Sequence, residues 1–322
     1  MTDPVRILLH NAQTSGLAAR TRAAYRNVTV EECQSYEALP DQISRFRPDV
    51  VYTVRFDGTS GYPRDALFGE NGPAWVANGG AGTDHFGVWD PTEVTVTNAA
   101  GVAADMMAEF VMGAFLHFTL NVPGLQADKA DKVWRARLVR PIKGQTLLVI
   151  GLGQTGCAIA KRAHAFGMKV IGTRARPQEM ENVEEVHAAS DLFDLLPRAD
   201  FIAVSTPLTE TTRGLLGRDA FALMKPGVIL ADVSRGGIID GDAALCALTD
   251  GRVAGAALDV FETEPLPEDS RFWTAPNTLI SPHASSVFDG WEDASFDLFL
   301  KNLDHWIVGE PLFNVVDPMR GY

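Results

Sequence analysis

The chain has 322 residues, 46% hydrophobic and 21% charged, which is the composition of an ordinary soluble globular protein of about two domains. Its formal net charge of −13 argues against a general binder of nucleic acids or of acidic membranes. The three cysteines, Cys33, Cys157 and Cys246, form no C-x-x-C pair, so we expect a reducing compartment and neither a disulfide framework nor a metal site. Because the N-terminus has no signal-peptide pattern, we expect a cytoplasmic protein.

The first third of the chain alternates strands with helices. Helical patterns at Ser15–Arg26 and Tyr36–Phe46 separate apolar runs that predict strands at Val5–Leu9, Val28–Val30, Val50–Val54, Ala74–Asn78 and Val94–Thr97. This alternation predicts a small parallel α/β domain. The loop Gly79–Asp84 follows the fourth strand, and its three glycines expose backbone N–H groups that either hold a carboxylate or belong to a plain turn.

A long apolar pattern follows and predicts a helix over Gly101–Asn121. The run Ala103–Val122 is long enough to consider as a membrane span, but it contains two acidic residues and a histidine, so a buried interdomain helix is the better interpretation. Residues Pro123–Pro141 are mixed in charge and include Trp134, which predicts a helix or an arm that reaches across a surface.

The stretch LLVIGLGQTG, residues 147–156, is the main motif of the chain. Leu147–Ile150 predicts a buried strand that runs directly into the G-x-G-x-x-G of Gly151, Gly153 and Gly156, and a helical pattern follows. In this context the first glycine permits a tight turn, the second lets a pyrophosphate approach, and the third lets the helix pack on the strand. The helix N-terminus then offers N–H groups to the phosphates. The alternative is an ordinary strand-to-helix turn with incidental glycines.

More strands follow the glycine motif, with helical stretches such as Asp191–Leu196 and Asp242–Leu248 between most of them. We expect them at Met168–Thr173, Phe201–Ser205, Val228–Val233, Val253–Val260 and Thr278–Ile280. Together they predict a doubly wound sheet of about six strands, followed by a last helix over Gly290–Gly309. The cleft between the two α/β halves is the expected ligand site.

Three polar residues come after late strands of this sheet, where such a fold places its chemistry: Arg235, Glu264 and His283. Reduction of a 2-oxo acid needs a guanidinium to hold the carboxylate and polarise the carbonyl. It also needs a proton donor for the developing alkoxide, which suits a histidine whose charged form a neighbouring carboxylate favours. Singly, each residue has an ordinary structural explanation, but the set beside a dinucleotide loop favours catalysis.

With these motifs the sequence resembles the D-isomer-specific 2-hydroxyacid dehydrogenase family, which includes glyoxylate and hydroxypyruvate reductases. The resemblance covers nearly the whole chain, through GGAGTD, KGQTLLVIGLGQTG, STPLTETTRGLLG, KPGVILADVSRGGIID, GAALDVFETEPLP, SPHAS and GEPLFNVV. It implies two doubly wound parallel-sheet domains, a Rossmann cofactor domain at 99–285 inserted into a flavodoxin-like substrate domain at 1–98 and 286–322. It also implies a two-fold homodimer through the cofactor domains, in which the Pro123–Pro141 arm wraps the partner.

The same resemblance implies that Arg235, Glu264 and His283 are the catalytic triad, and that the backbone of Ala81 and Gly82 holds the substrate carboxylate. It places the following residues at the cofactor: Gly151, Gly153, Gln154, Thr155, Gly156, Thr206, Pro207, Thr212, Val233, Ser234 and Asp259. Arg55, after the third strand, is a candidate for the substrate side chain, with a surface arginine as the alternative.

The sequence departs from the family pattern at His85, at Val233-Ser234 and at Ser205, which leaves the substrate open. The chain ends soon after NVV, so we do not expect a regulated phosphoglycerate dehydrogenase, and Glu264 argues against formate oxidation. The expected activity is reduction of a small 2-oxo acid to a D-2-hydroxy acid with NAD(P)H. The alternative is a cofactor-sensing binding protein of the same fold, as in the family's corepressors.

The turn after the second strand of the cofactor domain bears on cofactor choice. An NAD-specific site places an acidic residue there for the ribose hydroxyls. This chain has Thr173, Arg174 and Arg176 in that turn, and the next acid is Glu179. Two arginines would attract a 2′-phosphate, so we expect NADP to be preferred over NAD. The alternative is that the arginines are solvated and only tolerate the ribose.

Overall fold

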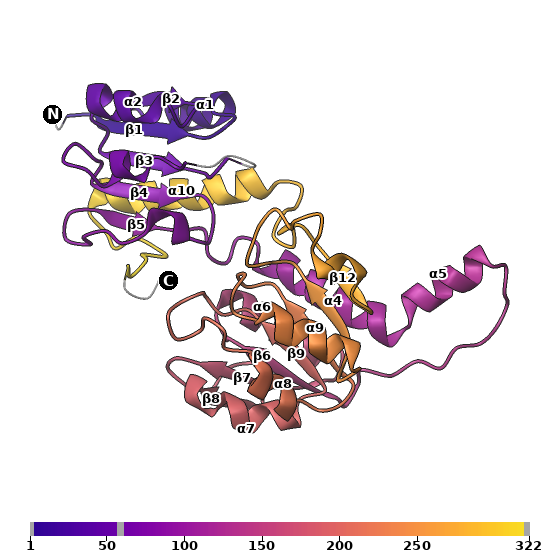
Figure 1. The fold of residues 1–322 in the computed structure, drawn as a ribbon. Coiled ribbons are helices and arrows are strands. Elements are labelled where there is room, and N and C mark those ends of the chain that lie inside the picture. Colours follow the sequence, from indigo (N-terminus) through magenta and orange to yellow (C-terminus); the bar gives the residue numbers. More distant parts are fainter. Residues whose placement is uncertain (1–2, 57–60, 319–322) are drawn as a thin grey trace. The chain divides into compact units, whose positions relative to one another are not determined.

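The computed structural model describes residues 3–56 and 61–318, and the chain divides into two compact units (Figure 1). Unit 1 comprises Met1–Val102 and Asp289–Tyr322, and unit 2 comprises Ala103–Phe288. The boundaries expected from the sequence, 98/99 and 285/286, compare with 102/103 and 288/289 in the structure. Unit 1 is therefore built from both ends of the chain, and unit 2 from its middle.

Unit 1 contains a five-stranded parallel sheet in the order β2-β1-β3-β4-β5, which is the flavodoxin-like order expected from the sequence. Its strands are β1 (Val5–His10), β2 (Val28–Cys33), β3 (Val50–Thr53), β4 (Trp75–Asn78) and β5 (Thr95–Thr97). Its helices are α1 (Ser15–Ala24), α2 (Leu39–Phe46), α3 (Arg64–Leu67), η1 (Asp84–Phe86) and α10 (Trp291–Val308). A strand that helices cover on both faces is apolar at successive positions. In β1, Ile7 and Leu9 pack towards α1 and α10, and Leu8 packs towards α2 and α3.

Unit 2 contains a seven-stranded parallel sheet in the order β12-β11-β10-β9-β6-β7-β8, which confirms the expected Rossmann-type fold. Its strands are β6 (Thr146–Ile150), β7 (Lys169–Arg174), β8 (Glu185–Ala188), β9 (Phe201–Val204), β10 (Val228–Asp232), β11 (Val253–Leu258) and β12 (Thr278–Ile280). Because all seven strands are parallel, their carboxyl ends lie at one edge of the sheet. The turns after these strands carry the candidate site.

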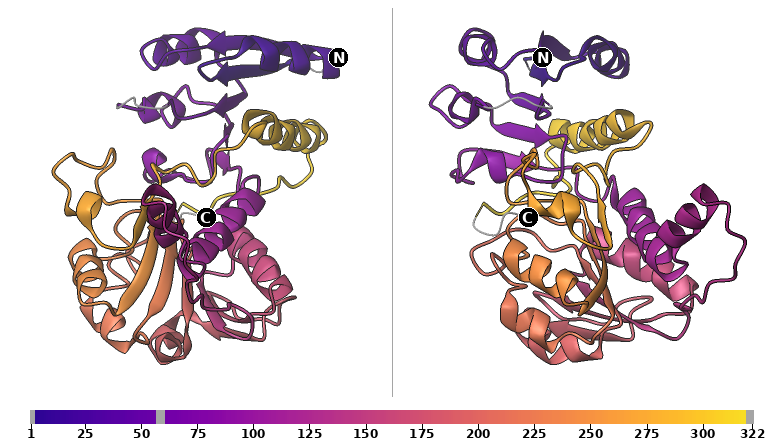
Figure 2. Two further views of the ribbon diagram at one scale, coloured as in Figure 1. Left: turned by 90° about the vertical axis from the view of Figure 1, so that its right-hand side faces the viewer. Right: turned by 45° about the vertical axis from the view of Figure 1, so that its right-hand side comes forward.

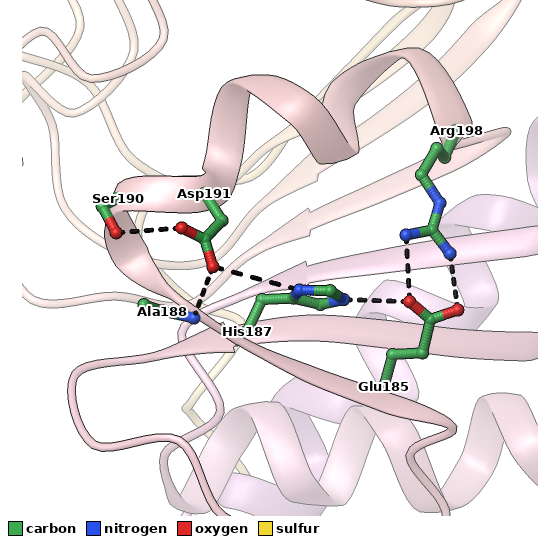
Figure 3. A network of polar contacts seen from close by, with 6 residues as sticks. All are labelled: Glu185, His187, Ala188, Ser190, Asp191 and Arg198. Carbon is green, nitrogen blue, oxygen red and sulfur yellow. Dashed lines mark hydrogen bonds and ion pairs between the residues drawn. The ribbon is translucent and has the colours of Figure 1, made fainter.

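The sequence predicted about six strands in unit 2, and β8 is the one it missed. This edge strand is EVHA, with no run of apolar residues and no fully buried position. Side-chain bonds hold it instead, as Figure 3 shows: Arg198 forms two bonds to Glu185, at 2.6 and 2.9 Å, and His187 Nε2 lies 2.9 Å from the same carboxylate. The hydrogen bonds from Arg198 and His187 outweigh desolvation and lower the pKa of Glu185 to about 2.

Helices cover both faces of the second sheet (Figure 2). One face packs against α4 (Ala104–Thr119) and α6 (Gln154–Ala165). The other packs against α7 (Leu192–Leu195), α8 (Arg218–Leu223) and α9 (Gly241–Thr249), and short 3-10 turns lie at η2 (Ala189–Asp191), η3 (Leu196–Arg198) and η4 (Arg271–Thr274). The apolar helix predicted near residue 110 is α4, and within the described ranges no helix is long and apolar enough to cross a membrane.

The predicted arm consists of α5 (Val122–Ala130) and an irregular segment that returns to β6, and Figure 1 shows α5 standing away from the sheet of unit 2. Asp128 is buried and accepts two bonds from Arg137, at 2.5 and 2.9 Å, and one from Arg135 at 2.7 Å. Two large apolar residues of the returning segment are fully solvent-exposed: Trp134 at 103% and Leu138 at 100%. The returning segment is thus tied to α5 through two arginines, while large apolar side chains stay in solvent.

Candidate active site

The glycine loop joins β6 to α6 as expected, and two of its glycines are required by close packing. A Cβ on Gly156 would lie 2.1 Å from the carbonyl oxygen of Gly151. Gly151 itself has a φ of 98°, and its Cβ would lie 2.9 Å from Cα of Thr206 in the turn after β9. Any side chain at these two positions would push the turn, the helix and the neighbouring strand apart.

Gly153 differs, because a Cβ there would meet no described protein atom within 4 Å. It is the N-cap of α6, and among the described side chains none caps this helix, whose first turn also contains no acidic residue. The first N–H groups of a helix lack intrahelical partners, and Gln154 and Thr155 occupy that first turn. An open approach to uncapped N–H groups fits the pyrophosphate of a dinucleotide.

The strand after α6 carries the residues expected at the ribose. Thr173 is buried, and its Oγ1 accepts a bond from the N–H of Gly151 at 3.3 Å, so its side chain supports the glycine loop. Arg174 is half-buried beside Met180, with 3.4 Å between Nη1 and Sδ, whereas Arg176 is exposed. The region that would face a 2′-phosphate therefore contains two cations and no acid before Glu179.

The turn after β9 is closed by its own side chains. The Ser205 hydroxyl donates to the carbonyl of Gly151 at 2.9 Å, which ties this turn to the glycine loop. Thr212 donates to the carbonyl of Pro207 at 2.7 Å and accepts from the N–H of Thr209 at 2.7 Å. Thr206, Pro207 and Thr212 thus belong to one fixed turn beside Gly151, and whether they contact a cofactor stays a prediction.

The three expected catalytic residues come together within unit 2. Nδ1 of His283 lies 2.8 Å from one oxygen of Glu264, and the other oxygen accepts the N–H of Phe261 at 2.9 Å. Burial alone would raise the pKa of Glu264, but these two hydrogen bonds and the charges of His283 and Arg235 lower it below its usual value. Glu264 is therefore ionised at neutral pH and holds the imidazole through Nδ1.

Arg235 follows β10 and belongs to the same constellation. Its Nη1 donates to the carbonyl of Ser234 at 2.8 Å. A Cβ on the next residue, Gly236, would lie 1.9 Å from the carbonyl oxygen of Phe261, so the arginine turn packs directly on the segment that leads to Glu264. Val233 and Ser234, expected at the cofactor, are both buried in this turn.

Two buried aspartates support these turns, and the sequence singled out only one of them. The carboxylate of Asp259 accepts the N–H groups of Ala284 and Ser285, at 2.8 and 3.0 Å, and its place beside the nicotinamide stays a prediction. Asp232 was not singled out, and its carboxylate accepts the N–H of Ser234 at 3.0 Å. A carboxylate at the end of a buried strand was the available signal.

The candidate substrate residues lie in unit 1. Arg55 is exposed after β3, and the loop with Ala81 and Gly82 follows β4. Asn98 donates to the carbonyl of Ala81 at 2.7 Å, and Asn78 donates to the carbonyls of Gly80 and Gly82 at 2.9 and 2.8 Å. In a planar trans peptide the N–H of the next residue points the opposite way, so the N–H groups of Ala81 and Gly82 face away from these asparagines. Sequence reasoning missed both asparagines.

Metal chemistry has no visible candidate in the part of the chain that the structure describes. Across residues 3–56 and 61–318, no group of three or more histidine, cysteine, aspartate and glutamate side chains is arranged to hold a metal ion.

The family model for the NAD binding domain of D-isomer specific 2-hydroxyacid dehydrogenases matches residues 112–285, which lie in unit 2. A glyoxylate reductase of Thermococcus litoralis is 35% identical over 263 residues, covering 77% of this chain and 78% of that enzyme. A D-3-phosphoglycerate dehydrogenase of Methanocaldococcus jannaschii is 36% identical over 247 residues, covering 75% of this chain but 47% of that enzyme.

Among solved structures, an NADPH-dependent glyoxylate/hydroxypyruvate reductase from Sinorhizobium meliloti, crystallised with NADP and sulfate, superposes with a TM-score of 0.81. It is 26% identical, and the match covers 99% of this chain and 100% of that one. The glycine loop, the uncapped helix and the bonded glutamate–histidine pair agree with these similarities. The chain therefore belongs to the D-isomer specific 2-hydroxyacid dehydrogenase family, a family of oxidoreductases with a nicotinamide-cofactor domain.

Proposed function

We propose that the protein reduces a small 2-oxo acid of the glyoxylate or hydroxypyruvate type to a D-2-hydroxy acid, with NADPH preferred as the hydride donor. The observation that carries this proposal is the 2.8 Å pair of Glu264 and His283 in unit 2, which also contains Arg235 and the glycine loop. The two reductases described above, from Thermococcus litoralis and Sinorhizobium meliloti, support the substrate class.

The chemistry divides among the three side chains. NADPH, when bound, supplies a hydride to the carbonyl carbon of the substrate. Arg235 polarises the carbonyl and binds the carboxylate with its guanidinium fork. His283 donates a proton to the carbonyl oxygen through Nε2, because Glu264 engages Nδ1. The Glu264 carboxylate stabilises the protonated imidazole before the transfer and orients the ring throughout.

The cofactor is proposed to bind along the glycine loop, with its pyrophosphate at Gly153 and the first turn of α6. Arg174 and Arg176 are proposed to hold the 2′-phosphate. A charge-assisted hydrogen bond contributes about 1.5–3 kcal/mol, so even one would favour NADPH by roughly tenfold or more. The NADP complex of the Sinorhizobium meliloti reductase supports this preference.

In unit 1, the N–H groups of Ala81 and Gly82 are proposed to hold the substrate carboxylate, and Arg55 is proposed to select the rest of the molecule. An arginine suits an anionic or hydroxylated side chain. The similarity to the D-3-phosphoglycerate dehydrogenase of Methanocaldococcus jannaschii makes the 3-phosphoglycerate/3-phosphohydroxypyruvate couple the second candidate.

We also propose a homodimer formed through the arm after α4, in a reducing compartment such as the cytoplasm, which three free cysteines favour. Arg135 and Arg137 hold the returning segment on Asp128 and leave Trp134 and Leu138 exposed for a second copy. Sedimentation at micromolar concentration should show a dimer for the wild type, and replacing both Trp134 and Leu138 by Ser should give a folded monomer. A monomeric wild type would contradict the proposal.

The activity is tested by following NADPH oxidation with a panel of glyoxylate, hydroxypyruvate, 3-phosphohydroxypyruvate, pyruvate and branched or aromatic 2-oxo acids. We expect turnover with glyoxylate or hydroxypyruvate. Turnover with the phosphorylated acid alone would favour the second candidate. Tight NADPH binding with no turnover on any acid would contradict a reductase and favour a cofactor-sensing protein.

A further inference from the structure

Two buried aspartates lie at the carboxyl ends of neighbouring strands of unit 2, β10 and β11. Asp232 ends β10 with 2% of its surface exposed, and Asp259 follows β11 with 1% exposed. Their backbones are bonded, since the N–H of Asp259 donates to the carbonyl of Asp232 at 3.0 Å. Each carboxyl group holds a different turn, and each turn carries one catalytic residue.

Asp259 fixes the His283 turn and is amply supplied with donors. Its backbone carbonyl accepts the N–H of His283 at 2.8 Å. Its carboxylate accepts the N–H groups of Ala284 and Ser285, at 2.8 and 3.0 Å, and the hydroxyl of Ser285 at 2.5 Å. Three donors on one carboxylate hold the turn that carries His283 in place.

Asp232 receives fewer hydrogen bonds than Asp259. Its Oδ1 accepts both the N–H and the hydroxyl of Ser234, the residue before Arg235. Its register partners on the two neighbouring strands are apolar: Val204 of β9 and Leu258 of β11. The pKa of Asp232 is raised to about 7, and burial is the largest cause. The charge of Asp259 also raises this pKa, whereas the Ser234 hydrogen bonds and the charge of Arg235 oppose the rise.

We propose that Asp232 is a positioning residue that sets the anion affinity of Arg235, by shaping the arginine turn through Ser234 and by offsetting the guanidinium charge when its own carboxyl is ionised. This inference rests on the proposed function, in which Arg235 binds the carboxylate of a 2-oxo acid. It adds to that function a built-in dependence of substrate affinity on pH.

The direction of the effect follows from the charges. Below neutral pH Asp232 is neutral, the guanidinium charge of Arg235 acts in full, and an anionic substrate binds more tightly. Above neutral pH the carboxylate offsets part of that charge, and binding weakens. By linkage, a bound anion must favour the protonated form of Asp232 to the same extent.

Asp232→Asn removes the charge but keeps the shape of the side chain, and its amide oxygen can still accept the two Ser234 hydrogen bonds. Oxamate, an anionic analogue of a 2-oxo acid, is titrated calorimetrically into the NADPH-saturated wild type and variant between about pH 5.5 and pH 8.5. The ratio of the wild-type Kd to the variant Kd should rise from about one to about five, as expected for an electrostatic term near 1 kcal/mol. All other ionisable groups are the same in both proteins, so their contributions cancel in the ratio.

A ratio that stays constant across this pH range would mean that Asp232 is only structural, and would overturn the proposal. Ser234→Ala provides the second variant, should Asp232→Asn fail to fold. It removes one donor from the ionised carboxylate, so the pH at which oxamate binding weakens should rise, and an unmoved midpoint would overturn the proposal as well.

Arg235→Ala distinguishes this failure from that of the proposed function. If Arg235→Ala abolishes oxamate binding while the ratio stays flat, only the role of Asp232 is wrong. If oxamate does not bind the wild type, or binds Arg235→Ala equally well, the assignment of Arg235 fails and both proposals fail with it.

Discussion

The glycine loop after β6 and the triad turns after β10, β11 and β12 lie at the same edge of one sheet, yet they are built in opposite ways. The loop owes its shape to missing side chains, since Cβ atoms on Gly151 and Gly156 would strike backbone at 2.9 and 2.1 Å. The triad turns are held by side chains that bond across long sequence distances, as His283 does to Glu264, 19 residues away. In the proposed function, cofactor binding therefore depends on the space left by the glycines, and catalysis depends on a set of hydrogen-bonded charges.

The largest effect is expected on the catalytic side of this comparison. His283→Ala should reduce turnover by about 10²–10⁴-fold, the usual contribution of a general acid, while NADPH affinity stays within a factor of two or so. Steady-state turnover and fluorescence titration of NADPH measure the two quantities. His305→Ala, a substitution at a half-buried histidine of unit 1, serves as the control and should not change turnover. Near-normal turnover of His283→Ala would remove this residue from the mechanism.

The next effect concerns the charges beside the loop. Arg174→Asp should weaken NADPH by at least about tenfold and spare or improve NADH, because a carboxylate repels the 2′-phosphate. The matched control is Lys169→Asp, at the other end of the same strand, which should change neither affinity. Equal kcat/KM of the wild type with NADPH and NADH would show that the two arginines do not read the phosphate.

Two glycines three residues apart test the role of space within the loop. Gly156→Ala should cost about 1–3 kcal/mol of folding free energy, because its Cβ meets the Gly151 carbonyl. Gly153→Ala should leave the melting temperature unchanged, since its Cβ enters open space, yet weaken NADPH by about tenfold by obstructing the pyrophosphate. Thermal unfolding with and without NADPH separates the two. An equal loss of stability in both variants would contradict this account of the loop.

The smallest expected effect is a shift along the pH axis. Glu264→Gln keeps a hydrogen-bond acceptor for Nδ1 but removes the charge that stabilises protonated His283. The fall in kcat/KM at high pH should therefore begin at lower pH, by about one pH unit. Glu262→Gln, an exposed neighbour, is the control. A profile that does not move would show that the 2.8 Å pair is not coupled to proton transfer.

This contrast also explains what could be predicted from the sequence. The glycine loop is local, so spacing alone located Gly151, Gly153 and Gly156 on the strand, turn and helix where the structure has them. Strand ends also located Arg235, Glu264 and His283, because parallel strands end at one edge. The hydrogen-bond partners of Asp232, Asp259, Asn78 and Asn98 could not be predicted, since they depend on which carbonyls and N–H groups come within bonding distance after folding. Strand β8 was not predicted because its sequence has no apolar pattern, and its side chains form ion pairs instead.

The most direct test of the central claim is the configuration of the product. The wild type, supplied with NADPH and the 2-oxo acid that it reduces fastest, is run to completion and the hydroxy acid is separated by chiral chromatography. We expect one D-2-hydroxy acid for each NADPH oxidised, and no product from His283→Ala on the same timescale. An L-2-hydroxy acid, a racemate, or full product from His283→Ala would contradict hydride delivery to one face of a carbonyl protonated by His283.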